Sequence, residues 1–179
     1  IEEGFDVAFR IGPTPAKGLT STVLGPAQVR YCCSRAYLKR RGAPKVPAEL
    51  KQHDCIIVLH EGEPVRWPFV GERGLELLPV EGRLRFNSFA LAHAAALGGL
   101  GIAIFPEFTC AADLRARRLV TVLDDVAPEV GGVSLVHPSA RYLSARVRAF
   151  VALVQRRLAA QPWVHREGRG RASLRAPGR

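Results

Sequence analysis

The stretch from Arg83 to Phe108, RLRFNSFALAHAAALGGLGIAIFPEF, constrains the fold more than any other part of the chain. Leu84 to Phe86 is a short apolar run that predicts a strand, and Phe89 to Leu97 is mostly Ala and Leu, which favour a helix. Leu100 to Phe105 predicts a second strand that ends at Pro106. A strand, a helix and a strand in one sheet predict a parallel crossover.

The residues that flank this helix decide which of its ends can bind a ligand. Asn87 and Ser88 precede it and are good N-caps, whereas Gly98 and Gly99 follow it, where glycine closes helices. A phosphate-binding loop needs its glycines before the helix, so these glycines indicate helix termination instead of nucleotide binding. The N–H groups at Asn87, Ser88 and Phe89, with the helix dipole, predict a small-anion site.

Composition sets limits on the class of protein. The 179 residues are 47% hydrophobic and 23% charged, which is ordinary for a globular chain with one substantial core or two lobes. Runs of about 18 uncharged apolar residues are missing, and so is a leader-like start, so nothing in these residues indicates a membrane or export. The chain contains no Met, and we interpret it as a fragment that lacks its natural start.

The four cysteines are expected to be buried free thiols. Cys32, Cys33, Cys55 and Cys110 form no C-x-x-C pair and have no histidine at zinc spacing. Three of them lie in apolar extended runs, where free Cys behaves as a small hydrophobe. We therefore expect no metal, no cofactor and a reduced cytoplasmic protein.

The formal net charge of +10 suggests contact with polyanions. From Gln161 onward, five arginines stand against Glu167 among Gly, Pro and Ser residues, so residues 161–179 are expected to form a disordered basic tail. Such a tail binds DNA non-specifically, with an affinity that falls with salt.

Strands and helices alternate along the rest of the chain. Further strands are predicted at 5–11, 20–24, up to Cys33, 55–59, 119–123 and 133–137, with Gly25-Pro26 closing the second of these. Further helices are predicted from Ser34 to Arg41, from Pro47, from Pro106 to Arg117 and over the amphipathic run 147–158. Residues 61–82 predict an antiparallel insertion. The alternation predicts an α/β fold with mostly parallel sheets.

Small ligands bind such sheets at the carboxyl ends of strands. Three strand ends are candidates: Arg10-Ile11, Asn87-Ser88 and Phe105-Pro106. Arg10 either pairs with a surface carboxylate or binds a ligand carboxylate through its guanidinium. Phe105 and Pro106 either pack in the core or line the ligand site.

The sequence does not predict a catalytic site. The histidines are scattered, and the closest cluster, His53, Cys55 and His60, does not share one helical or strand face. Ser88 is not in a G-x-S-x-G elbow. Asp124 and Asp125 are neighbours and are expected in a solvated turn. We therefore expect a binding protein without turnover.

Four segments in register resemble one family: FDVAFRIGP, CCSRAYLKRRGAPKVPAELKQHDCIIV, LRFNSFALAHAAALGGLGIAIFPEF and ARVRAFVALVQRRLA. Together, from about Phe5 to Ala160, they resemble the effector-binding domain of LysR-type transcriptional regulators. The resemblance implies two α/β lobes like those of type II periplasmic binding proteins, with a small-molecule effector in the cleft between them. It also implies dimers or tetramers, and an upstream winged helix-turn-helix, missing from this chain, that binds promoter DNA.

The resemblance also implies how the chain divides. Residues 1–25 would be a partial first lobe, residues 26–132 a complete second lobe, and residues 133–160 the return strand and C-terminal helix of the first. The effector, a small organic anion, would contact the following residues: Arg10, Ile11, Asn87, Ser88, Phe89, Phe105 and Pro106.

The helix from Phe89 to Leu97 has His93 as its only polar side chain, so it should be covered on more than one side. The resemblance implies that Ala92, His93 and Ala96 meet a partner subunit. The alternative interpretation of the whole chain is a periplasmic-type solute-binding protein for transport.

Overall fold

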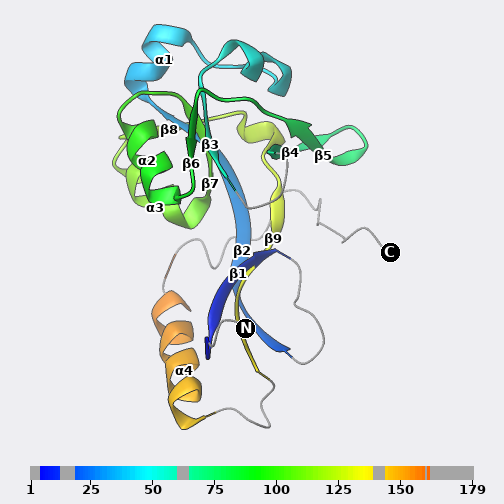
Figure 1. Cartoon of the computed structure of the whole chain (residues 1–179), viewed down its shortest axis with the longest axis vertical. Helices are drawn as coiled ribbons and strands as arrows, with labels where there is room; N and C mark the ends of the chain where they lie inside the picture. The colour runs from blue at the N-terminus through cyan, green and yellow to red at the C-terminus, as the bar shows by residue number, and fades with distance from the viewer. Residues whose placement is uncertain (1–4, 13–18, 60–64, 139–143, 160, 162–179) are drawn as a thin grey trace. The chain divides into compact units, whose positions relative to one another are not determined.

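The computed structural model describes residues 5–12, 19–59, 65–138, 144–159 and 161 (Figure 1). Within them the chain forms two compact units, one made of the residues up to Ala27 and from Glu129 onward, the other of Gln28–Pro128. We call them unit 1 and unit 2. The predicted basic tail beyond Gln161 lies outside the described residues.

Unit 2 is built on a five-stranded sheet in the order β8-β2-β7-β3-β6. Its strands are β2 (Leu19–Ser34, from Gln28 onward), β3 (Cys55–Val58), β6 (Leu84–Phe86), β7 (Ile102–Pro106) and β8 (Leu119–Val122). Strand β2 runs antiparallel to β7 and β8, whereas β3 is parallel to both β6 and β7. The predicted crossover from β6 through α2 (Phe89–Leu97) to β7 is confirmed. Helix α3 (Glu107–Arg115) makes a second one, from β7 to β8.

The alternation of side chains along β2 fills both faces of this sheet. Cys32 faces the buried cluster that contains Ala92, Ala96 and Phe105. The neighbouring Tyr31 stacks on Phe69 with ring centroids 4.8 Å apart, and donates its hydroxyl hydrogen bond to Pro68 O. Phe69 lies on β4 (Arg66–Gly71), which pairs antiparallel with β5 (Gly74–Pro79). The antiparallel insertion predicted over residues 61–82 is thereby confirmed.

Unit 1 contains a smaller sheet and one long helix. Strand β1 (Ala8–Gly12) pairs antiparallel with β9 (Glu129–Pro138), which also neighbours β2. Helix α4 (Ala145–Ala159) confirms the predicted amphipathic helix. It buries Val147 and Val151 and leaves Phe150 and Leu153 exposed.

The prediction that Gly25-Pro26 ends a strand is wrong, because β2 continues from Leu19 to Ser34. Pro26 lies just before the unit boundary at Ala27, where β2 changes its neighbours from β9 to β7 and β8. Proline has no N–H to donate to a neighbouring strand, but its backbone can be extended. It is therefore tolerated at the point where β2 exchanges one neighbouring strand for another.

The short helices begin at the capping residue and the prolines that the sequence indicated. Ser34 caps α1 (Arg35–Arg41) by accepting a hydrogen bond from Tyr37 N at 3.2 Å, and Gly42 ends it with a positive φ of 74°. Pro47 opens a 3-10 helix, η1 (Pro47–Gln52). Helix α3 ends at Arg115, before the predicted Arg117, because Arg117 takes the left-handed conformation with φ of 56°.

Helix α2 differs from its prediction in two respects. Ser88 lies at the N-cap position, but its side chain makes no capping hydrogen bond. Ala92 and Ala96 were expected on the outward face, yet both are 0% exposed and pack on the sheet of their own unit. The assignment of these two alanines to an outward surface is wrong. Leu91, which is 54% exposed, marks the outward face instead.

All four cysteines are free and buried, as predicted. Cys32 Sγ lies 3.8 Å from Cys110 Sγ, and this hydrogen bond together with burial raises the pKa of the Cys32 thiol. Burial raises the pKa of Cys33, and likewise that of Cys55, to about 12 from an ordinary value of 9.0. These thiols are therefore protonated members of the core.

The two helix-capping serines give a matched pair of variants. Ser34→Ala removes the hydrogen bond to Tyr37 N, so we expect the free energy of unfolding to fall by about 1 kcal/mol. Ser88→Ala removes no capping hydrogen bond and should change it by less than about 0.5 kcal/mol. Urea unfolding of both variants measures the difference, and equal losses would contradict the assignment of the caps.

The raised thiol pKa values predict a loss of stability at alkaline pH. Because the folded state holds the Cys33 proton up to about pH 12, the stabilisation is intact below pH 9.0 and is lost as the pH rises from there. The slope is about 1.4 kcal/mol per pH unit for each thiol. Urea unfolding between pH 8 and pH 11 should show a shallower slope for Cys33→Ala than for the unchanged protein, and identical slopes would contradict the prediction.

Candidate functional site

Strands β3, β6, β7 and β8 run in the same direction, so their carboxyl ends form one edge of the sheet in unit 2. We call it the carboxyl edge. Asn87 follows β6 there, and Glu107 follows β7. The antiparallel β2 enters unit 2 at the same edge, where Val29 pairs with Pro106 and Arg30 with Phe105.

Helix α2 presents its N-terminus at the carboxyl edge. Asn87 is exposed, Ser88 is half-buried and Phe89 is 37% exposed. The first turn contains no acidic residue, and the Ser88 side chain makes no capping hydrogen bond. The positive end of the α2 dipole is therefore left without a negative side chain from its own first turn, which favours an anion.

Helix α3 begins at the same edge but carries its own negative charge. Glu107 stands in its first turn, and Thr109 Oγ1 donates a hydrogen bond to Pro106 O at 2.7 Å. A carboxylate in the first turn already interacts favourably with the helix dipole. Of the two helix N-termini, that of α2 is the better anion site.

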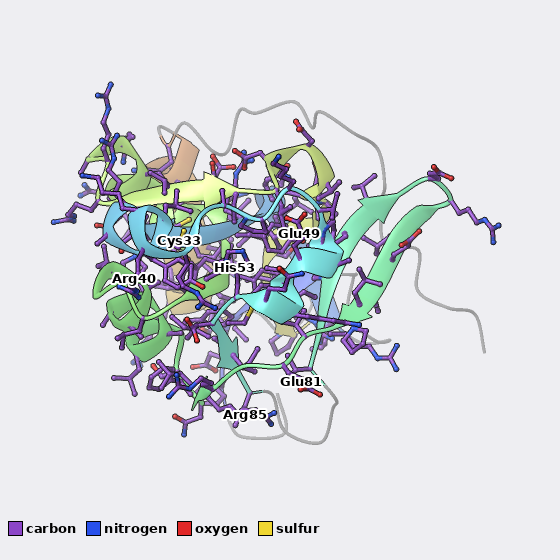
Figure 2. The ribbon with its side chains drawn as sticks, turned by 90° about the horizontal axis from the view of Figure 1, so that it is seen from above. Cys33, Arg40, Glu49, His53, Glu81 and Arg85 are labelled. Carbon is purple, nitrogen blue, oxygen red and sulfur yellow. The ribbon has the colours of Figure 1, made fainter. Side chains whose placement is uncertain are left out.

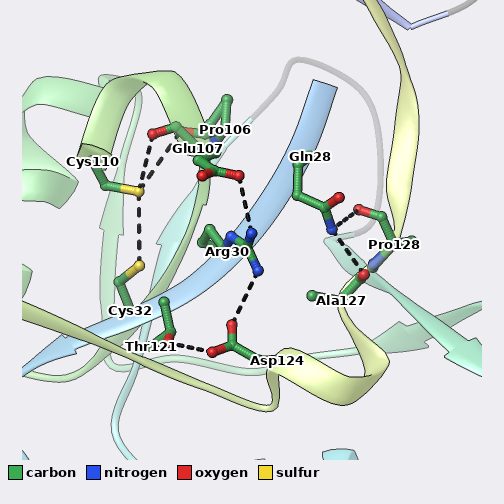
Figure 3. A network of polar contacts seen from close by, with 10 residues as sticks. All are labelled: Gln28, Arg30, Cys32, Pro106, Glu107, Cys110, Thr121, Asp124, Ala127 and Pro128. Carbon is green, nitrogen blue, oxygen red and sulfur yellow. Dashed lines mark hydrogen bonds and ion pairs between the residues drawn. The ribbon is translucent and has the colours of Figure 1, made fainter. Parts of the chain in front are cut away.

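A polar network connects α3, β2 and the 3-10 helix η2 (Asp124–Val126), as Figure 3 shows. The Arg30 guanidinium lies 3.0 Å from Glu107 Oε2 and 3.2 Å from Asp124 Oδ1. Asp124 also accepts a hydrogen bond from the Thr121 hydroxyl. The Arg30 side chain is 19% exposed and is shared by two carboxylates, so it cannot take an incoming carboxylate without displacing one of them.

The side chain of Gln28, the first residue of unit 2, is hydrogen-bonded to the last two residues of that unit. Its Nε2 donates to Ala127 O at 2.9 Å and to Pro128 O at 3.2 Å, as Figure 3 shows. Val29 N donates to the same Pro128 O at 3.2 Å. These bonds join the entry and the exit of unit 2 beside the Arg30 network.

The other predicted site residues have different surroundings. Phe105 is 0% exposed and belongs to the buried cluster, and Pro106 is also buried, so both pack in the core and position the edge. Arg10 and Ile11 lie on β1 of unit 1, paired with Ser134 and Val133, and both are exposed. Asn87, Ser88 and Phe89 remain together at the start of α2.

His93 makes a contact within its own unit. Its Nε2 lies 3.0 Å from Asp113 Oδ2, at ion-pair distance but without the alignment of a hydrogen bond. Asp113, on α3, is buried and lies 2.5 Å from Arg118 Nε. The His93 ring meets Phe105 edge-on at 5.5 Å. His93 thus connects α2 to α3.

Sequence reasoning missed the Arg30 network. Asp124 lies exposed in the short 3-10 turn η2, as predicted, but its carboxylate also pairs with Arg30, which the prediction did not include. A signal was present, since Arg30 is the only charged residue in the apolar run QVRYCC. A lone charge in a buried strand requires a partner.

Among the described residues, no group of three or more His, Cys, Asp and Glu side chains is placed to hold a metal ion. None of the described helices combines the length and the apolar character needed to cross a bilayer. A groove of about 470 Å³ lies between η1 and the β4-β5 hairpin, and no predicted site residue lines it.

Comparison with known proteins identifies relatives that are longer than this chain. A probable HTH-type transcriptional regulator, LtrA of Klebsiella pneumoniae, is 32% identical over 84% of this chain and 50% of its own length. The HTH-type transcriptional regulator PtxR of Pseudomonas aeruginosa is 30% identical over 91% of this chain and 52% of its own length. The chain thus spans about half the length of the curated relatives it matches.

The fold is shared with solved regulatory domains. The regulatory domain of CrgA, a LysR-type transcriptional regulator from Neisseria meningitidis, superposes with a TM-score of 0.77 at 23% identity, covering 88% of this chain and 77% of that one. The type II periplasmic-binding-protein-like α/β class expected from the sequence is thereby confirmed. The sequence model of the family described as the LysR substrate binding domain matches residues 1–159. The chain therefore belongs to the LysR substrate-binding domain family.

Proposed function

We propose that this chain is the effector-sensing domain of a LysR-type DNA-binding transcriptional regulator, and that it binds a small organic anion. The family match over residues 1–159 supports the first part. The relatives named above are transcriptional regulators by name. Promoter DNA is the proposed partner of the whole protein, which would act in the cytoplasm, where the DNA is.

The observation that supports an anion is the N-terminus of α2 at the carboxyl edge, where the Ser88 side chain makes no capping hydrogen bond and the first turn has no acidic residue. Ligands of open α/β sheets bind at this edge. A carboxylate there would accept backbone N–H groups of the first turn and interact favourably with the dipole. The Arg30 network, with two carboxylates on one guanidinium, would repel an anion, so it favours the α2 end of the edge.

The residues of unit 2 that we propose to contact the effector are Asn87, Ser88 and Phe89. For Arg10 and Ile11 of unit 1, effector contact stays a prediction. Phe105 and Pro106 act through their position in the core beneath the edge. We propose binding without turnover and without a cofactor. The rival proposal, a solute-binding protein for transport, has no support from the relatives named above.

Two variants at one position test the anion site. Ser88→Asp places a carboxylate at the N-cap of α2, so it should keep or raise the melting temperature while repelling an anionic effector. Ser88→Asn is the neutral control of the same size and should keep binding. Thermal shifts against a panel of small carboxylates and sulfur oxyanions measure both effects, since a ligand that binds only the folded state raises the melting temperature.

We expect one or more anions of the panel to stabilise the unchanged protein and Ser88→Asn but not Ser88→Asp. Stabilisation by neutral sugars or peptides alone would contradict the anionic effector. Equal stabilisation of all three proteins would contradict the position of the site.

We also propose that the protein is a homodimer or a tetramer that uses the outward face of α2. Leu91 is 54% exposed, and its exposed neighbours Ala90 and Ala94 are apolar. An apolar helix face of this kind is typical of an interface. A second copy of the chain is the proposed occupant.

Leu91→Glu should lower the oligomeric state in sedimentation velocity, because it would bury an unpaired carboxylate in the interface. Leu77→Glu on β5, where Leu77 is 50% exposed, is the matched control and should leave the profile unchanged. An unchanged profile for Leu91→Glu would contradict this interface. Ala92→Glu and Ala96→Glu are unsuitable, because both alanines are in the core.

A further inference from the structure

The end of unit 2 opposite to the carboxyl edge is strongly basic. There Ser34, the last residue of β2, pairs with Leu119, the first residue of β8. Arg35 directly follows Ser34 and Arg118 directly precedes Leu119, so the start of α1 lies beside the turn between α3 and β8. We name the basic side chains of these two segments the basic rim: Arg35, Lys39, Arg40, Arg41, Arg115, Arg117 and Arg118.

The side chains of the rim are all positively charged and exposed to solvent. All of its members are exposed, and the segments 35–41 and 115–118 contain no acidic residue. The inward residues of α1 are Tyr37, which is buried, and Leu38. Figure 2, which looks onto this part of unit 2, labels Arg40 of α1.

Several side chains of the rim make hydrogen bonds or ion pairs within unit 2. Arg40 donates to Gly99 O at 2.8 Å, and Arg41 donates to Gln52 O at 2.7 Å. Arg118 pairs with Asp113, and Arg115 Nε donates to Ala111 O at 3.3 Å within α3. These contacts account for four of the side chains.

The side chains of the remaining three, Arg35, Lys39 and Arg117, make no hydrogen bond or ion pair with any residue that the structure describes. Arg35 and Arg117 also stand where their residue type is locally unfavourable. Arg35 is the first residue of α1, where the helix dipole disfavours a cation. Arg117 has a left-handed backbone, φ 56°, which glycine or asparagine adopts at lower cost. Lys39 lies in the last turn of α1, where the helix dipole favours a cation, but neither local structure nor packing explains Arg35 or Arg117.

We propose that the basic rim binds the phosphate backbone of duplex DNA. Guanidinium groups bind phosphate oxygens in pairs, and α1 is about 10 Å long, enough to follow several charges of a duplex that carries one per ~1.7 Å of its axis. The only aromatic side chain of the two segments, Tyr37, is buried, so the rim offers no platform for stacking unpaired bases. The contact is independent of sequence and lies at the opposite end of the sheet from the effector site.

The test is the salt dependence of binding to a random-sequence DNA duplex, measured with the purified protein by fluorescence anisotropy. The rim variant is Arg35→Gln, Lys39→Gln and Arg117→Gln together. The control is Arg66→Gln, Arg73→Gln and Arg85→Gln together, which removes the same charge from exposed side chains elsewhere on unit 2. Any contribution from residues 161–179 is the same in all three proteins.

Each lost phosphate contact should lower the salt slope by about 0.9. Between 50 and 200 mM salt the unchanged protein should therefore lose about 40-fold more affinity than the rim variant does, if all three contacts form. The control should keep the slope of the unchanged protein. Equal slopes for the rim and control variants would overturn the proposal. It would also be overturned if the rim variant kept its DNA binding but no longer bound anionic lipid vesicles that the unchanged protein binds.

Arg117→Gly separates a binding role from a structural one. Glycine relieves the left-handed backbone at this position, so the melting temperature should stay or rise while the DNA affinity at 50 mM salt falls about threefold or more. A lower melting temperature with unchanged DNA affinity would show that Arg117 serves the fold. Neither measurement involves an effector, so the outcome is separate from that of the Ser88 variants.

Discussion

Strand β2 lies between β7 and β8 and runs antiparallel to both, and the rest of unit 2 depends on this placement. Because β2 opposes its neighbours, it begins at their carboxyl ends and finishes at their amino ends. Arg30 is thereby placed at the carboxyl edge, and Ser34 with α1 at the opposite end. The same strand supplies Tyr31 to one face of the sheet and Cys32 to the other. One strand thus fixes the core and both polar ends.

The two ends of unit 2 differ in how their charges are compensated. At the carboxyl edge, Arg30 is held by Glu107 and Asp124, and the helix that starts beside them carries its own acid. At the N-terminus of α2, the first turn has no acidic residue and Ser88 makes no capping hydrogen bond. At the other end, basic side chains outnumber their acidic partners, Asp54 and Asp113. An anion of low charge suits the first end, and a polyanion suits the second.

Much of the fold of unit 2 could be predicted from local patterns. The crossover through α2, the cap at Ser34 and the antiparallel insertion follow from periodicity and from end signals that act over a few residues. The failures required knowledge of distant partners. Gly25-Pro26 looks like a strand end because the change of neighbours along β2 depends on residues about a hundred positions away.

The candidate site was predictable only in part, for the same reason. The N-terminus of α2 follows from local sequence, but its uncapped state does not, because the side-chain oxygen of Ser88 fits a cap by type alone. Which alanines of α2 face the sheet could not be read from a helix that is apolar all round. The network of Arg30 joins residues 77 and 94 positions apart, beyond the reach of any local pattern.

We propose above all that an anion binds at the first turn of α2. Amide chemical shifts of the protein, followed by NMR while a stabilising carboxylate is added, test it most directly. The account predicts the largest saturable shifts at the N–H groups of Ser88, Phe89 and Ala90, with small changes at Glu107 in the first turn of α3. Shifts centred on Glu107, or on α1 and the basic rim, with the start of α2 unaffected, would contradict it.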